Sequence, residues 1–244
     1  MDTMLFRLNS YAVYSFSLVV VISFLWGAFV FYKKAIESHF DDISVLDAVV
    51  YIAFWGFILG RLAFALLNWN EFSGRLSRIF FLKDFPGLSQ WGMLAGLLVG
   101  LWFLAKRIKV KYIDWLDLVA LGFSATLPVF FAGLCLIQFN WIYLGTAIVL
   151  SLLFGYFWKA EDEYRTYSWY RNKRTQAKTG YISGAVLCLY GLLNLIFFVI
   201  FKGKLIDVLL SVFLIVAGIV LVYIRSGRTL KEDIKNISKY GRKH

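Results

Sequence analysis

Residues 43–68 read ISVLDAVVYIAFWGFILGRLAFALLN, and this stretch decides the fold class. Its 26 positions hold only two charged residues, Asp47 and Arg61. A helix rises about 1.5 Å per residue, so about 20 apolar residues cross a bilayer core about 30 Å thick. The stretch therefore predicts a helix that spans a membrane.

Six further apolar stretches of the same kind lie along the chain. The complete set of predicted spans covers residues 11–32, 43–68, 88–105, 115–138, 141–158, 181–201 and 205–224. Only Phe139 and Asn140 separate the fourth span from the fifth, which predicts a tight helical hairpin. We therefore expect an all-α integral membrane protein, with one seven-helix domain over residues 1–225 and a basic tail over residues 226–244.

The composition supports a membrane protein and argues against a nucleic-acid partner. Hydrophobic residues make up 60% of the chain, charged residues 17%, and the mean hydropathy is +0.70. Soluble domains carry about 25% charged residues. The net charge of +11 comes from lysines and arginines that flank apolar runs, as in the cytoplasmic loops of membrane proteins. We therefore expect no nucleic-acid binding.

Lysines and arginines are distributed unequally between the two sides of the predicted bundle. The side of the amino terminus carries 6 of them and the opposite side carries 19. Since cytoplasmic loops carry the excess, we predict the amino terminus outside and the carboxyl terminus inside. Lys33 and Lys34 follow the first apolar run instead of preceding it, so this run is predicted to be a retained helix and not a signal peptide.

Glycines recur at intervals of four residues in the second and third predicted spans. They are Gly56 and Gly60 in one span, and Gly92, Gly96 and Gly100 in the other. Helices in lipid associate largely through close packing of small residues. We therefore expect both glycine ridges to face neighbouring helices.

Arg61 is a charged residue inside a predicted span, where a charge costs about 2.5–3.5 kcal/mol on insertion scales. It lies eight residues before Trp69, roughly 12 Å below the outer interface. Either its side chain extends to that interface or it binds the phosphate of an outer-leaflet lipid. Gln90 and Asn194 are polar positions for which a helix–helix hydrogen bond is the alternative to a lipid contact.

The sequence carries no metal-binding or nucleophile pattern. Cys135 and Cys188 lie in the middle of apolar runs, which is typical of buried core residues, and no Cys/His ligand spacing is present. We expect neither a metal nor a cofactor. His39 and His244 lie outside the predicted spans, and no deep relay of acidic residues or histidines appears. These features leave little support for a small transporter subunit.

Several short segments, in order, resemble the bacterial prolipoprotein diacylglyceryl transferase family. These segments are Tyr11-Ala-Val-Tyr14, Gly56-Phe-Ile-Leu-Gly60-Arg61-Leu62, Gln90-Trp91-Gly92-Met-Leu-Ala-Gly96 followed by Lys106-Arg107, residues 117–133, and Tyr190-Gly191. The resemblance implies seven helices with the amino terminus outside, in the bacterial cytoplasmic membrane. It also implies transfer of diacylglycerol from phosphatidylglycerol to the cysteine thiol of a lipoprotein precursor.

The resemblance also assigns residues to roles. Arg61 would hold the lipid phosphate, and Tyr11 would line the head-group pocket. The family histidine falls on Gln90, and one family arginine falls on Asn194. A second family arginine is absent from the segment Gly133–Phe139, and the family's extracellular head is replaced by a two-residue turn. The alternatives to transfer are therefore a relative that binds lipid or a membrane partner without catalysis, and a small transporter subunit.

Overall fold

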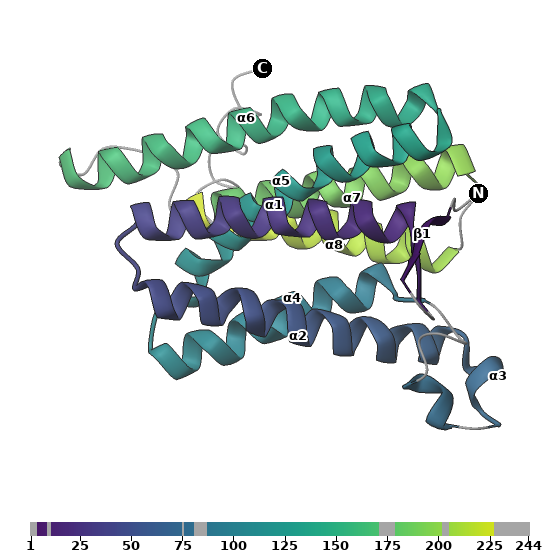
Figure 1. Cartoon of the computed structure of the whole chain (residues 1–244). Coiled ribbons are helices and arrows are strands. Elements are labelled where there is room, and N and C mark those ends of the chain that lie inside the picture. The colour runs from purple at the N-terminus through teal and green to yellow at the C-terminus, as the bar shows by residue number, and fades with distance from the viewer. Residues whose placement is uncertain are drawn as a thin grey trace, which may run out of the picture. The chain divides into compact units, whose positions relative to one another are not determined.

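Seven helices of the described structure are long and apolar enough to cross a membrane. The computed structural model (Figure 1) describes residues 4–8, 11–74, 76–80, 87–170, 179–201 and 205–226. Its elements are β1 (Met4–Leu8), β2 (Tyr11–Tyr14), α1 (Ser15–Glu37), α2 (Asp42–Leu67), α3 (Trp69–Phe72), η1 (Leu76–Ile79), α4 (Gln90–Ile108), α5 (Tyr112–Gln138), α6 (Trp141–Tyr170), α7 (Tyr181–Phe201) and α8 (Leu205–Ser226). The predicted all-α membrane architecture is confirmed.

Helix α7 has the predicted bounds, and the other helices differ from their predicted spans by at most five residues at either end, except at the carboxyl end of α6. Residues 11–14 were predicted to be helical, but they form strand β2, which pairs antiparallel with β1. This is consistent with the preference of Tyr and Val for strands. Helix α6 continues to Tyr170, beyond the predicted end at residue 158, and the part of it that is apolar enough to cross a membrane is Trp141–Asp162. Residues 227–244 of the predicted tail lie outside the described residues.

The tight turn predicted between the fourth and fifth spans is present. Helix α5 ends at Gln138 and α6 begins at Trp141. Phe139 has a positive φ of 48°, and the Asn140 side chain accepts a hydrogen bond from the Ile142 N–H at 2.9 Å. The asparagine therefore serves as the N-cap of α6.

The chain divides into two compact units. The first unit contains residues 1–31 and 117–244, and the second contains residues 32–116. The core of the first unit gathers buried apolar side chains from α1, α5, α6 and α7, namely Val30, Ala120, Leu121, Ala125, Phe157, Ile182 and Val186. Large apolar side chains are also exposed, among them Val199 at 75% and Phe213 at 66%. Such surfaces suit a lipid environment.

In the second unit, α2 and α4 pack antiparallel along the glycine ridges. A Cβ added at Gly96 would collide with the Trp55 carbonyl oxygen, and one at Gly92 would collide with that of Leu59. A Cβ at Gly100 would lie 2.8 Å from the Tyr51 carbonyl oxygen. The two backbones therefore lie too close for any larger residue at these positions without a shift.

In the first unit, α7 and α8 also pack through glycines, and their contacts run in opposite chain directions. A Cβ at Gly184 would lie 2.9 Å from the Gly218 carbonyl oxygen, and a Cβ at Gly218 would lie 2.5 Å from that of Gly184. Gly191 lies in the same way against Ser211. Two antiparallel helix pairs, one in each unit, thus rely on the same small-residue packing.

Candidate functional site

Arg61 is a buried cation of the second unit whose guanidinium binds several backbone carbonyls. The side chain is only 4% exposed and lies in the second half of α2. Its Nε–H donates to the carbonyl oxygen of Ile79 at 2.7 Å, and Nη1 and Nη2 donate to the carbonyls of Gly87 at 3.0 Å and Arg78 at 3.2 Å. The guanidinium therefore joins α2 to the middle of the connection, at η1, and to its last residues before α4.

Two aromatic rings lie against the same guanidinium. Its Cζ atom is 5.7 Å from the ring centroid of Phe64 and 5.5 Å from that of Phe72. Phe72 is fully buried, and the two rings meet edge to face at 6.1 Å. Cation–π contacts of this kind contribute about 0.5–2 kcal/mol, more where water is excluded. The rings and the three carbonyls together hold the charge of Arg61 inside the protein.

The beginning of α4 is fixed against α2 by backbone contacts. The Ser89 N–H donates to the Gly60 carbonyl at 3.0 Å, and the Ser89 hydroxyl accepts from the Gly92 N–H at 3.4 Å as the N-cap. Gly87 has a φ of +154°, and a Cβ there would collide with the Phe64 ring. Only glycine therefore fits between the connection and α2 at this position.

The predicted site residues lie in different parts of the chain. Gln90 is the first residue of α4, in the same unit as Arg61, and its side chain is exposed. Tyr11 lies in β2, opposite Leu8, in the first unit. Asn194 also belongs to the first unit, in α7. The four residues therefore fall into two pairs, Arg61 with Gln90 in the second unit and Tyr11 with Asn194 in the first.

Asn194 is engaged within its own helix. Its Nδ2 donates to the Tyr190 carbonyl at 2.8 Å. The Tyr190 ring in turn packs edge to face on Phe123 of α5, with ring centroids 5.2 Å apart. A neutral amide in this position supplies hydrogen bonds but no positive charge.

Asp117 has a role that the sequence did not predict. Its carboxylate, on α5, accepts from the Gly180 N–H at 2.5 Å and from the Ser183 N–H at 2.9 Å, at the start of α7. Arg225 of α8 donates to the Thr179 carbonyl at 2.5 Å. The amino end of α7 is thus capped by a residue 63 positions away, and no local motif signals it.

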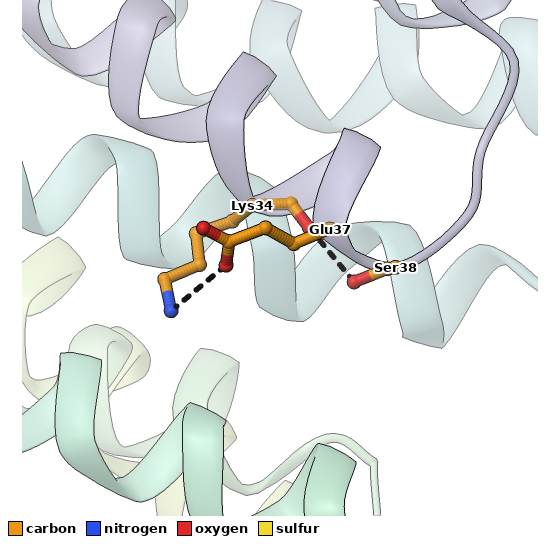
Figure 2. Close-up of polar contacts among 3 residues, drawn as sticks. All are labelled: Lys34, Glu37 and Ser38. Atoms are coloured by element: carbon orange, nitrogen blue, oxygen red, sulfur yellow. Dashed lines mark hydrogen bonds and ion pairs between the residues drawn. The ribbon is translucent and has the colours of Figure 1, made fainter.

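Lys34 is buried, whereas a lysine that flanks an apolar run is expected to be solvated. It is 1% exposed, and its Nζ atom lies 3.4 Å from Glu37. Figure 2 shows the lysine side chain beside that glutamate, while the Ser38 hydroxyl donates to the Lys34 carbonyl at 2.8 Å. Its neighbour Lys33 is exposed, as expected of a flanking charge. Burial of one lysine in such a pair cannot be read from a charge count.

The described residues show no metal or disulfide arrangement. No group of three His, Cys, Asp or Glu side chains that could hold a metal ion is found among them. Cys135 and Cys188 are both free thiols.

Comparison with known proteins shows the family of the chain. The family model for prolipoprotein diacylglyceryl transferase matches residues 3–131. The chain belongs to this family. The matched residues run from β1 into α5 and include Tyr11, Arg61 and Gln90, whereas Asn194 lies outside them. The family membership therefore rests on the amino-terminal half of the chain.

Curated relatives of the transferase family are distant. A phosphatidylglycerol–prolipoprotein diacylglyceryl transferase of Caldanaerobacter subterraneus subsp. tengcongensis is 25% identical over 120 residues, covering 48% of this chain and 46% of the relative. A Thermoanaerobacter protein of the same name is 25% identical over 122 residues, covering 49% and 46%. One from Deinococcus radiodurans is 24% identical over 127 residues, covering 50% and 37%. The chain thus spans less than half the length of the relatives it matches.

Proposed function

We propose that this membrane protein binds phosphatidylglycerol and transfers its diacylglyceryl group to the cysteine of a lipoprotein precursor. The relatives are named for this reaction. The cysteine sulfur would attack the glyceryl carbon, a carbon–sulfur bond would form, and the carbon–oxygen bond to phosphate would break. Glycerol phosphate would leave, and the thiol proton would pass to water. The nucleophile belongs to the acceptor, so the chain needs no reactive cysteine of its own.

The burial of Arg61 in the family-matched half is the observation that carries this proposal. A charge is retained inside a span where it serves a structural partner or an anion. A guanidinium has five N–H donors, and three of them are directed at the carbonyls of Arg78, Ile79 and Gly87. The two further N–H groups, one on Nη1 and one on Nη2, are the donors we propose for a lipid phosphate. Tyr11 and Gln90 are the accompanying candidates for the head-group contact.

A second candidate function is lipid or partner binding without transfer. Gln90 and Asn194 favour it, because they occupy the positions at which the sequence resemblance places a histidine and an arginine. An amide cannot take up a proton as imidazole does, and it cannot form the charged, planar fork of an arginine. Retention of lipid with loss of chemistry would follow from these replacements.

The two functions are separated by complementation of a bacterium depleted of its own transferase. The full chain, the Arg61→Ala variant and the Caldanaerobacter relative would be expressed from the same vector. Rescue of lipoprotein modification by the full chain supports transfer. If the relative rescues and the full chain, present in the membrane at the same level, does not, transfer is excluded and binding alone remains.

We further propose that the protein resides in the bacterial cytoplasmic membrane, with its amino terminus outside and its carboxyl terminus inside. The charge distribution of 19 against 6 supports this orientation. A reporter that is active only outside the cytoplasm, fused to the carboxyl terminus, should be silent. An active reporter at that position would reverse the orientation.

A further inference from the structure

The short elements between α2 and α4 carry exposed aromatic side chains next to the span α2. They are α3, η1 and the residue that follows, Phe80, which we call together the α3–η1 segment. Phe80 is 83% exposed and Trp69 is 49% exposed. Aromatic side chains that are exposed next to a span are typical of the interface between lipid and water.

The depth of this region follows from contacts with numbered positions of α2. Ser89 is bonded to the Gly60 carbonyl, which lies seven residues, or about 10 Å, before the end of α2 at Leu67. Gly87 lies against Phe64, about 4.5 Å before that end. The end of the connection therefore descends by one to two helical turns alongside α2.

The contacts of Arg61 show that the α3–η1 segment lies at a similar depth along α2. The same guanidinium binds the carbonyls of Gly87, Ile79 and Arg78, each within 3.2 Å. Ile79 and Gly87 therefore lie around one guanidinium group, and Phe80 is the residue that follows Ile79 in the chain. A helix of 26 residues is about 39 Å long, so about 4.5 Å at each end projects beyond a centred hydrocarbon core of about 30 Å. Phe80 is thereby placed at the boundary between acyl chains and head groups.

The hydrogen bonds of Arg61 also fit this depth. Non-helical backbone at membrane level is tolerated only where its polar groups find partners in the protein. Arg61 supplies a donor to three such carbonyls, two on the α3–η1 segment and one on the approach to α4. A charge inside the span thus satisfies backbone that water would otherwise have to solvate.

We propose that the α3–η1 segment is a membrane-surface element, with Phe80 inserted into the upper acyl region of the leaflet and Arg61 as its anchor. Its partner is the lipid leaflet that α2 and α4 cross. The inference is independent of whether the chain transfers diacylglycerol.

Site-directed fluorescence quenching tests this placement. Phe80→Cys would be made in a chain in which Cys135 and Cys188 are replaced, labelled with bimane, and reconstituted in vesicles of phosphatidylcholine and phosphatidylglycerol. Phe54→Cys, on the exposed middle of α2, is the lipid control. His39→Cys, exposed between α1 and α2, is the water control.

The label at position 80 should lose most of its fluorescence to a lipid spin-labelled near the head group and little to aqueous iodide. The label at position 54 should respond best to a deep spin label, and that at position 39 to iodide. Adding Arg61→Ala to the Phe80→Cys chain should exchange lipid quenching for iodide quenching. If position 80 behaves like position 39 in the otherwise wild-type chain, the segment faces water or a protein partner and the proposal fails.

Discussion

Replacing Arg61 should loosen the connection between α2 and α4. Arg61→Ala removes hydrogen bonds from a charged donor to the carbonyls of Arg78, Ile79 and Gly87. Such bonds contribute about 1.5–3 kcal/mol each. Their simple sum of roughly 5–9 kcal/mol is an upper bound, because the bonds share one side chain and water reaches part of the freed backbone. We expect a loss of roughly 3–5 kcal/mol in the free energy of unfolding.

The Arg61→Lys variant separates the anchoring role of Arg61 from its proposed role in binding phosphate. Three different nitrogens of the fork contact three carbonyls, and a lysine has one nitrogen. Lysine should therefore recover less than half of the stability, although it binds a phosphate well as a point charge. Arg107→Ala is the matched control: its Nη1 donates to the Tyr51 hydroxyl at 2.7 Å in an exposed position.

The assay is thermal unfolding in detergent together with the rate of trypsin cleavage after Arg78. A loss of 3–5 kcal/mol corresponds to a midpoint lower by roughly 6–20 °C for a chain of this size. Cleavage after Arg78 should be faster in Arg61→Ala and unchanged in Arg107→Ala. If Arg61→Lys matches wild type in both measurements, Arg61 does not act as the fork-shaped anchor described here.

Three further substitutions test the packing and the caps by thermal unfolding. Gly96→Ala should lower the free energy of unfolding by about 1–3 kcal/mol, because its Cβ meets the backbone of α2. Gly155→Ala, with open space around the position, should leave that free energy unchanged. Equal effects of the two substitutions would refute the close approach of α2 and α4. Asp117→Asn should cost about 1–3 kcal/mol, because it removes one of the two carboxylate oxygens that accept from N–H groups at the start of α7. Asp114→Asn should cost less than 1 kcal/mol. Equal losses would argue against the capping of α7 by Asp117. Asp41→Ala should cost about 0.5–2 kcal/mol as the N-cap of α2, and no loss would mean that water replaces it.

Hydropathy was sufficient to predict the seven spans. The middle of each span must be apolar because it lies in lipid, and runs of apolar residues can be recognised directly in the sequence. Tyr11–Tyr14 was assigned to a helix because apolar residues in a strand and in a helix look alike when the stretch is short. Pairing with β1 decides between them.

The candidate site was only partly accessible from the sequence. The insertion cost of a charge singled out Arg61, yet its three carbonyl partners lie 17 to 26 residues away and carry no side-chain signal. The same holds for Asp117, whose partners at the start of α7 are more than 60 residues distant. Backbone C=O and N–H groups are common to nearly all residues, so contacts to them become visible only in the structure.

The proposed binding of phosphatidylglycerol is tested most directly by the phospholipid that accompanies the purified protein. The full chain, Arg61→Ala and Arg107→Ala would be purified in mild detergent from a bacterium that contains phosphatidylglycerol and phosphatidylethanolamine, and their bound lipids quantified by mass spectrometry. We predict that phosphatidylglycerol is enriched over its share of the membrane in the full chain and in Arg107→Ala, and that this enrichment falls in Arg61→Ala. Bound lipid that matches the membrane composition in all three would contradict the account.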